Sequence, residues 1–115
     1  MSITRIAPGP RLCRAVVHGD TVYLAGHVIA DRSLGVRGQT AAILKLIDKH
    51  LAEAGTDKTK LLSVTIWLAD ITTFEEMNVA WDAWKDPDHL PARATVEAKL
   101  ASPEFLVEIA GIAAR

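Results

Sequence analysis

Arg93 is the residue whose type and place most directly suggest chemistry. It opens an alternating stretch, residues 93–98, in which Thr95 and Glu97 share its face. The planar guanidinium group of an arginine suits the capture of a small carboxylate through two parallel hydrogen bonds. An arginine that opens a strand can equally form a salt bridge at the rim of a sheet, and spacing alone leaves both interpretations open.

Glu108 is the second unusual residue, because it is the only charged side chain in the stretch 106–114, LVEIAGIAA. A carboxylate among apolar side chains needs a cation or a hydrogen-bond donor, so Glu108 is expected to be paired or functional. If residues 93–98 and 106–113 form neighbouring strands, Arg93 and Glu108 could together bind an anion and activate a water molecule. They could equally form a structural ion pair, and the spacing does not decide.

The other candidate groups carry weaker signals. Cys13 is the only cysteine, and no local Cys–His motif supplies the base that a nucleophilic thiol needs, so an ordinary thiol is favoured. The four histidines show no metal-ligand spacing, so no metal site is predicted. Only His27 suggests a role in binding, because it follows Gly26 at the end of an expected strand, where ligands often approach. Trp81 and Trp84 are interpreted as core or interface residues rather than a stacking platform.

Composition and charge restrict the class of protein. The 115 residues include 13 Lys and Arg against 14 Asp and Glu, which gives a formal net charge of -1. This balance argues against a nucleic-acid binder that works through bulk charge. No apolar run approaches the roughly 18 residues of a membrane helix, and the N-terminal segment MSITRIAPGP lacks the apolar core of a signal peptide. We therefore expect one domain over residues 1–115, in the cytoplasm, with no nucleic-acid or membrane partner.

Hydrophobic periodicity predicts the elements that must position these residues. Alternation with a period of two predicts strands, and apolar residues at spacings of three and four predict amphipathic helices. In chain order, the pattern predicts strands at 15–18 and 21–27, a polar loop that could hold a short strand at 31–38, a helix at 39–54, a strand at 62–68, a helix at 74–84, and strands at 93–98 and 106–113. In the strand at 62–68, the residues expected to face the core are Leu62, Val64, Ile66 and Leu68.

This order of elements predicts an α+β fold, with two helices packed on one face of a mixed β-sheet. The strand–helix–strand crossovers should be right-handed and parallel, with hairpins at both ends of the chain. The last predicted strand is apolar on both of its faces, whereas helices on one side cover only one of them. Because no other element is available, a second copy of the chain is the expected cover, and the protein is expected to be a homo-oligomer.

Two C-terminal segments form a specific motif, LPARATVEAKL at residues 90–100 and LVEIAGIAA at residues 106–114. They closely resemble the C-terminal motif of the Rid family, the reactive intermediate deaminases, which is also called the YjgF/YER057c/UK114 or endoribonuclease L-PSP family. Earlier segments agree in order, namely VYLAG at 22–26, EAG at 53–55, VTIWLAD at 64–70 and FEEMN at 74–78. The resemblance therefore covers nearly the whole chain.

The resemblance implies a chorismate-mutase-like fold and a homotrimer with clefts between its subunits. It also implies hydrolysis of reactive enamines and imines, such as 2-aminoacrylate and 2-iminopropanoate, to a 2-keto acid and ammonia, with no metal or organic cofactor. By position, Arg93 matches the arginine that binds the substrate carboxylate, and Glu108 matches the glutamate associated with the hydrolytic water. Asn78 and Gly26 match residues that line the cleft. Thr95 stands where many members have a Cys or Ser whose backbone carbonyl helps to hold water.

The chain departs from the family pattern at several positions of the expected cleft. Leu12 replaces an aromatic residue, Arg14 replaces a Gln, and His27 replaces the Gln that follows the cleft glycine. Leu12 and His27 are therefore expected to contact the substrate. These changes bear on the identity of the substrate more than on the reaction type, so a larger or differently charged imino acid is a candidate substrate.

Two other functions compete with an imine deaminase. A ligand-binding or regulatory trimer could use the same cleft without turnover, and the loss of the cleft aromatic at Leu12 keeps this alternative open. Cleavage of RNA, which the older family name suggests, is disfavoured by the charge balance and by the absence of a basic patch in the sequence.

Overall fold

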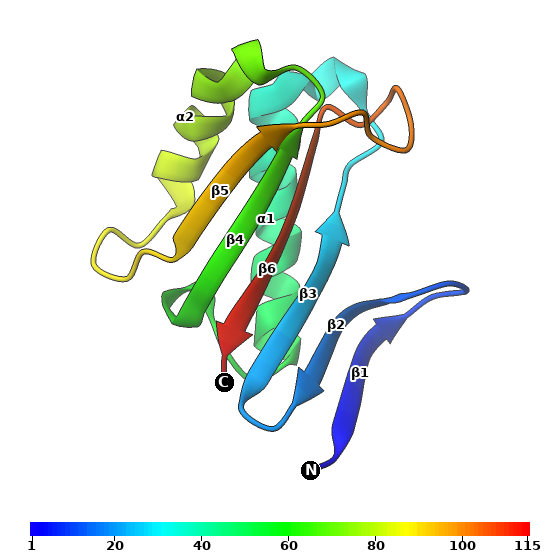
Figure 1. Ribbon diagram of the computed structural model, residues 1–115, viewed down its shortest axis with the longest axis vertical. Helices are drawn as coiled ribbons and strands as arrows, with labels where there is room; N and C mark the ends of the chain where they lie inside the picture. Colours follow the sequence, from blue (N-terminus) through cyan, green and yellow to red (C-terminus); the bar gives the residue numbers. More distant parts are fainter.

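The computed structural model describes all 115 residues and contains one six-stranded sheet and two long helices (Figure 1). In chain order, the elements are β1 (Ile3–Pro8), β2 (Cys13–His18), β3 (Thr21–His27), α1 (Gly35–Glu53), β4 (Leu61–Leu68), α2 (Phe74–Trp84), β5 (Ala92–Glu97) and β6 (Val107–Ala114). The strand order across the sheet is β1-β2-β3-β6-β4-β5. Neither helix is long and apolar enough to cross a membrane.

Both helices pack on the same face of the sheet, and no helix covers the opposite face (Figure 1). α1 runs behind the central strands, and α2 packs against α1 near the β5 edge. β4 and β5 pair in parallel, whereas every other pair of neighbouring strands is antiparallel. The predicted class, a mixed sheet with two helices on one face, is confirmed.

The core lies between the sheet and the two helices. Its helical side consists of residues at spacings of three and four, and its sheet side consists of alternate residues from the strands. Its fully buried members include Ile43, Leu44, Leu51 and Met77 from the helices and Val22, Ile66, Leu68, Val107 and Ile109 from the strands. Burial of a side chain of this size stabilises the fold by roughly 1.5–3 kcal/mol. The amphipathic pattern therefore accounts for the packing of both helices.

One residue of β4 departs from the predicted alternation. The register of β4 against β6 shifts between Leu61 and Ser63, so β4 contains an extra residue there. As a result, Leu61 is buried, and Leu62 is 54% exposed instead of facing the core as predicted.

β6, the last strand of the chain, occupies the centre of the sheet. It pairs antiparallel with β3 on one side and with β4 on the other. The expected C-terminal hairpin is therefore wrong, because β4 lies between β5 and β6. β5 instead forms an edge of the sheet and pairs only with β4. The apolar character of β6 on both faces is typical of a central strand.

Two further differences concern the N-terminal half. β1, which the sequence pattern did not predict, pairs with β2 from Ile3 opposite His18 to Pro8 opposite Cys13. It is a largely exposed edge strand that ends at a proline, so its periodicity is weak. The possible strand at 31–38 is wrong, because Arg32–Leu34 forms a 3-10 turn and α1 begins at Gly35 rather than at residue 39.

The face without helices, here called the open face, carries mainly small and apolar side chains. From β3 to β5 its residues are Tyr23, Gly26, Glu108, Ala110, Ile112, Ser63, Thr65, Trp67, Ala92, Ala94 and Val96. Tyr23 and Val96 are each 46% exposed, and Ile112 is 36% exposed. Exposed apolar side chains on a sheet face favour coverage by another protein surface. The expectation that the helices leave one face of β6 uncovered is thus confirmed.

We expect Gly111→Ala to lower the free energy of unfolding by about 1–3 kcal/mol. Gly111 lies on β6 opposite Val64, and a Cβ atom there would lie 2.9 Å from the backbone carbonyl oxygen of Ser63. Because backbone atoms of a central strand cannot move aside freely, the strand pairing must shift. Urea unfolding followed by circular dichroism measures the change. Gly9→Ala is the control, since its Cβ would meet only the Leu12 carbonyl oxygen at 3.5 Å, and equal losses in both variants would contradict the steric argument.

Candidate functional site

Arg93 lies on β5 and directs its side chain to the helix side of the sheet, as does its pairing partner Val64. The guanidinium carbon lies 5.0 Å from the ring centroid of Trp81 and 5.8 Å from that of Phe74, and Nη1 lies 3.9 Å from Met77 Sδ. No ion pair of the structure includes Arg93, so the alternative of a rim salt bridge is not realised within the protomer. The guanidinium thus lies against the rings of Trp81 and Phe74, and none of its N–H groups is bonded to a carboxylate.

Both aromatic rings that contact Arg93 belong to α2. Phe74, Asn78 and Trp81 follow one another at spacings of four and three residues, so they lie on one side of the helix. Asn78 is half-buried and shares this side with the two rings. The sequence pattern predicts that the tryptophans of this helix are core or interface residues, and their contact with Arg93 could not be inferred from it.

Thr95 lies two residues beyond Arg93 on the same face of β5, opposite Ile66. Its Oγ1 is buried and has no hydrogen-bond partner in the protomer. Buried polar groups are normally satisfied, so this hydroxyl is available to a ligand or to a water molecule. We call the cluster of Arg93, Thr95 and Asn78 the arginine half-site.

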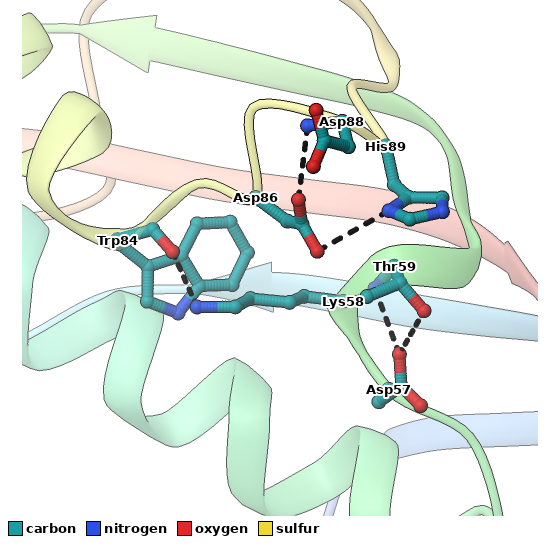
Figure 2. A network of polar contacts seen from close by, with 7 residues as sticks. All are labelled: Asp57, Lys58, Thr59, Trp84, Asp86, Asp88 and His89. Carbon is teal, nitrogen blue, oxygen red and sulfur yellow. Dashed lines mark hydrogen bonds and ion pairs between the residues drawn. The ribbon is translucent and has the colours of Figure 1, made fainter.

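The segment that leads into β5 is held by the polar network in Figure 2. Lys58 Nζ donates a hydrogen bond to the carbonyl oxygen of Trp84 and lies 5.0 Å from the centroid of the Trp84 ring. Asp86 accepts hydrogen bonds from the backbone N–H of Asp88 at 2.9 Å and from His89 Nδ1 at 3.2 Å. These bonds, chiefly that from Asp88, hold the pKa of Asp86 below its ordinary value. The network fastens the connection between α2 and β5, on which the arginine half-site depends.

Trp84 extends this support to both helices. Its Nε1 donates a 2.9 Å hydrogen bond to Asp48 Oδ2 on α1, and its ring centroid lies 5.4 Å from that of Trp81. A tilted aromatic pair of this kind adds stability beyond its buried area. Asp48 and Lys58 carried no sequence signal for this role, because their partner is far away in the chain.

Glu108 lies on the open face of β6, opposite Trp67 of β4. Its carboxylate leans over Gly26 of β3, since a Cβ atom added at Gly26 would lie only 2.1 Å from Glu108 Oε2. Only a residue without a side chain leaves this space. The carboxylate is half-buried and takes part in no ion pair of the protomer. We call Glu108 together with Gly26 the carboxylate half-site.

A β-bulge in β3 decides which side chains reach the open face. Leu24 pairs with Gly111 and His27 pairs with Ile109, so β3 contains one residue more than β6 between these pairs. The extra residue turns His27 to the helix side, where its side chain is 1% exposed. The structure therefore corrects the expectation that His27 contacts the substrate, because its ring lies in the core.

His27 occupies a polar niche within that core. Its Nδ1 donates a 2.7 Å hydrogen bond to the carbonyl oxygen of Ala25, and its ring centroid lies 5.3 Å from that of His50. The Nε2 atom of His27 is buried without a partner. Burial lowers the pKa of His27 below 6.5, and the charges of His50 and Arg14 lower it further, although the bond to Ala25 acts in the opposite sense. The imidazole is therefore neutral at pH 7.

The arginine half-site and the carboxylate half-site lie on opposite faces of the sheet. Arg93 shares the helix side with Val64, whereas Glu108 shares the open face with Trp67. β4 separates β5 from β6, so these two strands lie about 10 Å apart. The expectation that Arg93 and Glu108 lie on neighbouring strands is wrong, and one protomer does not bring them together. A site that uses both side chains has to form between two copies.

The remaining candidates are dispersed. Leu12 is 51% exposed in the connection between β1 and β2. Cys13 is a half-buried free cysteine at the start of β2.

No group of three or more His, Cys, Asp or Glu side chains is arranged to hold a metal ion. A surface groove of about 810 Å³ is lined mainly by the segment that follows β5 and contains neither half-site.

Comparison with known proteins shows a likeness over the whole chain. The sequence model of the family described as endoribonuclease L-PSP matches residues 2–115. A RutC family protein from Haemophilus influenzae is 44% identical over 114 residues, which cover 98% of each chain. The RutC family protein YoaB from Escherichia coli is 41% identical over 114 residues, which cover 99% of each chain.

Solved structures show the same likeness in the fold. A member of the YjgF protein family from Neisseria meningitidis has a TM-score of 0.92 at 40% identity, and the match covers 100% of this chain and 96% of the other. A member of the YjgF/YER057c/UK114 family from Mycobacterium tuberculosis has a TM-score of 0.89 at 26% identity, with coverage of 99% and 100%. A Rid family protein from Yersinia pestis has a TM-score of 0.88 at 26% identity, with the same coverage.

The burial of a neutral His27 predicts a loss of stability in acid. Because its folded-state pKa is lowered, the unfolded chain binds a proton more readily, so this contribution is fully present above pH 6.5 and is lost as the pH falls towards the folded-state pKa. Within this window the free energy of unfolding should fall by up to about 1.4 kcal/mol per pH unit. Urea unfolding at several pH values and one protein concentration measures the slope. His27→Phe should reduce it and the exposed His18→Phe should not, and an unchanged slope in His27→Phe would contradict the argument.

Proposed function

The chain belongs to the endoribonuclease L-PSP family, also named the YjgF/YER057c/UK114 family, and from this premise we propose that it hydrolyses reactive 2-imino acids and their enamine tautomers. The products are a 2-keto acid and ammonia. The observation that carries the proposal is the guanidinium of Arg93, which rests on aromatic rings and has no carboxylate partner. A guanidinium in this state suits the binding of a substrate carboxylate.

The reaction consumes one water molecule. With 2-iminopropanoate, the water oxygen adds to C2 and a proton passes to the nitrogen, which leaves a hydroxyl and an amino group on the tetrahedral C2. The C2–N bond then breaks, its electron pair leaves with the nitrogen, and the proton that the hydroxyl group loses is transferred to that nitrogen. Pyruvate and ammonia result. The enamine tautomer, 2-aminoacrylate, becomes the same imine when it takes a proton at C3.

The two half-sites divide the work of this reaction. Arg93 binds the substrate carboxylate and so holds C2 in place, while Thr95 and Asn78 complete the polar lining. Glu108 accepts a proton from the water that adds to C2 and returns a proton to the leaving nitrogen. Gly26 leaves the space in which the Glu108 carboxylate can approach C2.

We also propose a homotrimer in which each site forms between two subunits. Two observations support this assembly: Arg93 and Glu108 face opposite sides of one sheet, and the open face carries exposed apolar side chains such as Tyr23 and Ile112. In a closed ring, every subunit presents the same two surfaces to its neighbours. The arginine half-site of one copy would then lie against the carboxylate half-site of the next.

A ligand-binding or regulatory trimer is the second candidate function. It would use the same cleft and the same arginine, without proton transfer by Glu108. The exposed Leu12 favours this candidate, because an aliphatic side chain at this place encloses a ligand less well than an aromatic ring. The two candidates therefore differ in whether the protein accelerates the release of keto acid.

The deaminase predicts faster keto-acid release from imines that an amino-acid oxidase generates in situ, with catalase present. Arg93→Ala should lower kcat/KM by about 10- to 100-fold, because a charge-assisted hydrogen bond to the carboxylate is lost. Glu108→Gln should lower kcat by about 100-fold or more, because the water loses its base. Arg37→Ala is the matched control, since Arg37 forms an exposed ion pair with Glu76.

The result that contradicts this prediction is a folded, assembled protein that accelerates keto-acid release from no imine in a broad panel. If the same protein binds pyruvate and Arg93→Ala does not, the ligand-binding function replaces the deaminase. RNA binding that weakens with increasing salt would instead support the RNA-directed function that the older family name suggests.

A site shared between copies predicts complementation between two defective variants. Arg93→Ala and Glu108→Gln subunits, co-expressed in equal amounts, should form about one quarter intact interfaces, since each needs one unaltered residue from each partner. Activity should recover to about a quarter of the wild-type value, although either variant alone is defective. Native mass spectrometry verifies that mixed oligomers form, and mixed oligomers without recovered activity would contradict the shared site.

A further inference from the structure

Arg14 places a second cation beside the carboxylate half-site. It precedes Ala15, which pairs with Leu24 at the start of the β-bulge in β3. Because Ala15 is buried on the helix side, the alternation of β2 directs the exposed Arg14 to the open face. β2 and β3 are neighbours, so Arg14 lies on the strand next to Gly26, above which the Glu108 carboxylate is placed.

The charge of Arg14 is not neutralised within the protomer. No ion pair joins Arg14 to Glu108 or to any other carboxylate. Arg5, which pairs with Val16, also belongs to the open face, whereas Glu108 is the only acidic side chain that the six strands direct there. On the strand next to Gly26, the charge of Arg14 is therefore not offset by any carboxylate of the protomer.

A substrate with a single carboxylate has no negatively charged group for Arg14 to bind. Arg93 binds the carboxylate attached to C2, so a neutral side chain on C2 has no charged partner. A side-chain carboxylate one or two methylene groups from C2 would come within reach of a cation beside Glu108. Without such a cation, an acidic side chain would be repelled by the Glu108 carboxylate in a partly desolvated cleft.

We propose that the site selects 2-imino acids with a second carboxylate in the side chain, of the 2-iminosuccinate and 2-iminoglutarate class, and that Arg14 binds this carboxylate. The inference rests on the proposed deaminase function and specifies its substrate. The substrate is held at one end by Arg93 of one copy and at the other end by Arg14 of the copy that supplies Glu108. Arg14 contacts the substrate and sets specificity, and it takes no part in proton transfer.

The test compares an acidic and a neutral imine with the same assembled protein. Amino-acid oxidases generate 2-iminoglutarate from glutamate and 2-iminopropanoate from alanine, and keto-acid release above the uncatalysed rate gives kcat/KM. The native protein should prefer 2-iminoglutarate by about 10-fold or more. Arg14→Gln should lower kcat/KM for 2-iminoglutarate by about 10- to 100-fold and leave that for 2-iminopropanoate within about twofold. Arg14→Lys should keep part of the preference, and Arg5→Gln, the matched control on the same face, should keep all of it.

The outcomes separate this inference from the proposed function. Hydrolysis of 2-iminopropanoate without a preference for 2-iminoglutarate overturns the role of Arg14 and leaves the deaminase in place. An equal loss of kcat/KM for both imines in Arg14→Gln also overturns it, and a changed oligomer mass would then assign Arg14 to a subunit contact. If neither imine is hydrolysed faster than without protein, the proposed function itself fails.

Discussion

β6 hydrogen-bonds to β3 along one edge and to β4 along the other, and no other strand joins the N-terminal strands β1–β3 to the parallel pair β4–β5. Because β6 is the last strand of the chain, the sheet becomes continuous only when nearly the whole chain is present. The bulges in β3 and β4 are both defined by their register against β6. They decide which residues of the flanking strands turn to the core and which turn to the open face. The geometry of the carboxylate half-site therefore follows from the pairing of one central strand.

The two half-sites differ in physical character in a way that suits their proposed tasks. The arginine half-site is built from the edge strand β5 and the helix α2. A series of contacts through Trp81, Trp84 and Lys58 makes it rigid. Rigid support of this kind suits a group that has to orient a substrate. The Glu108 carboxylate instead lies over a glycine and remains unpaired, which suits a group that has to exchange protons. Their placement on opposite faces also prevents Arg93 and Glu108 from neutralising each other within one protomer.

Periodicity predicts the parts of this fold that depend on local burial, and it does not predict the parts that depend on strand pairing. Both helices and the fold class follow from amphipathic spacing, whereas the exposed edge strand β1 has too little pattern to be recognised. The expectations for His27 and Leu62 are wrong because His27 follows the bulge of β3 and Leu62 lies at that of β4, and only the pairing with β6 reveals either bulge. A shift of one residue reverses the direction of every later side chain in a strand. Arg93 and Glu108 were identified by type and spacing, but their separation depends on a strand order that no local pattern encodes.

The contact between Arg93 and Trp81 gives the molecule an intrinsic optical property. Trp81 is 5% exposed, and the guanidinium carbon lies 5.0 Å from the centroid of its ring. A cation this close to an indole perturbs its excited state, and an anion bound to the guanidinium offsets much of that field. If an anion binds there as proposed, the fluorescence of Trp81 is expected to change with the occupancy of the arginine half-site, whereas Trp67 belongs to the opposite face and lies outside that half-site. Trp81 is thus an intrinsic fluorophore at the place where recognition of the substrate is proposed.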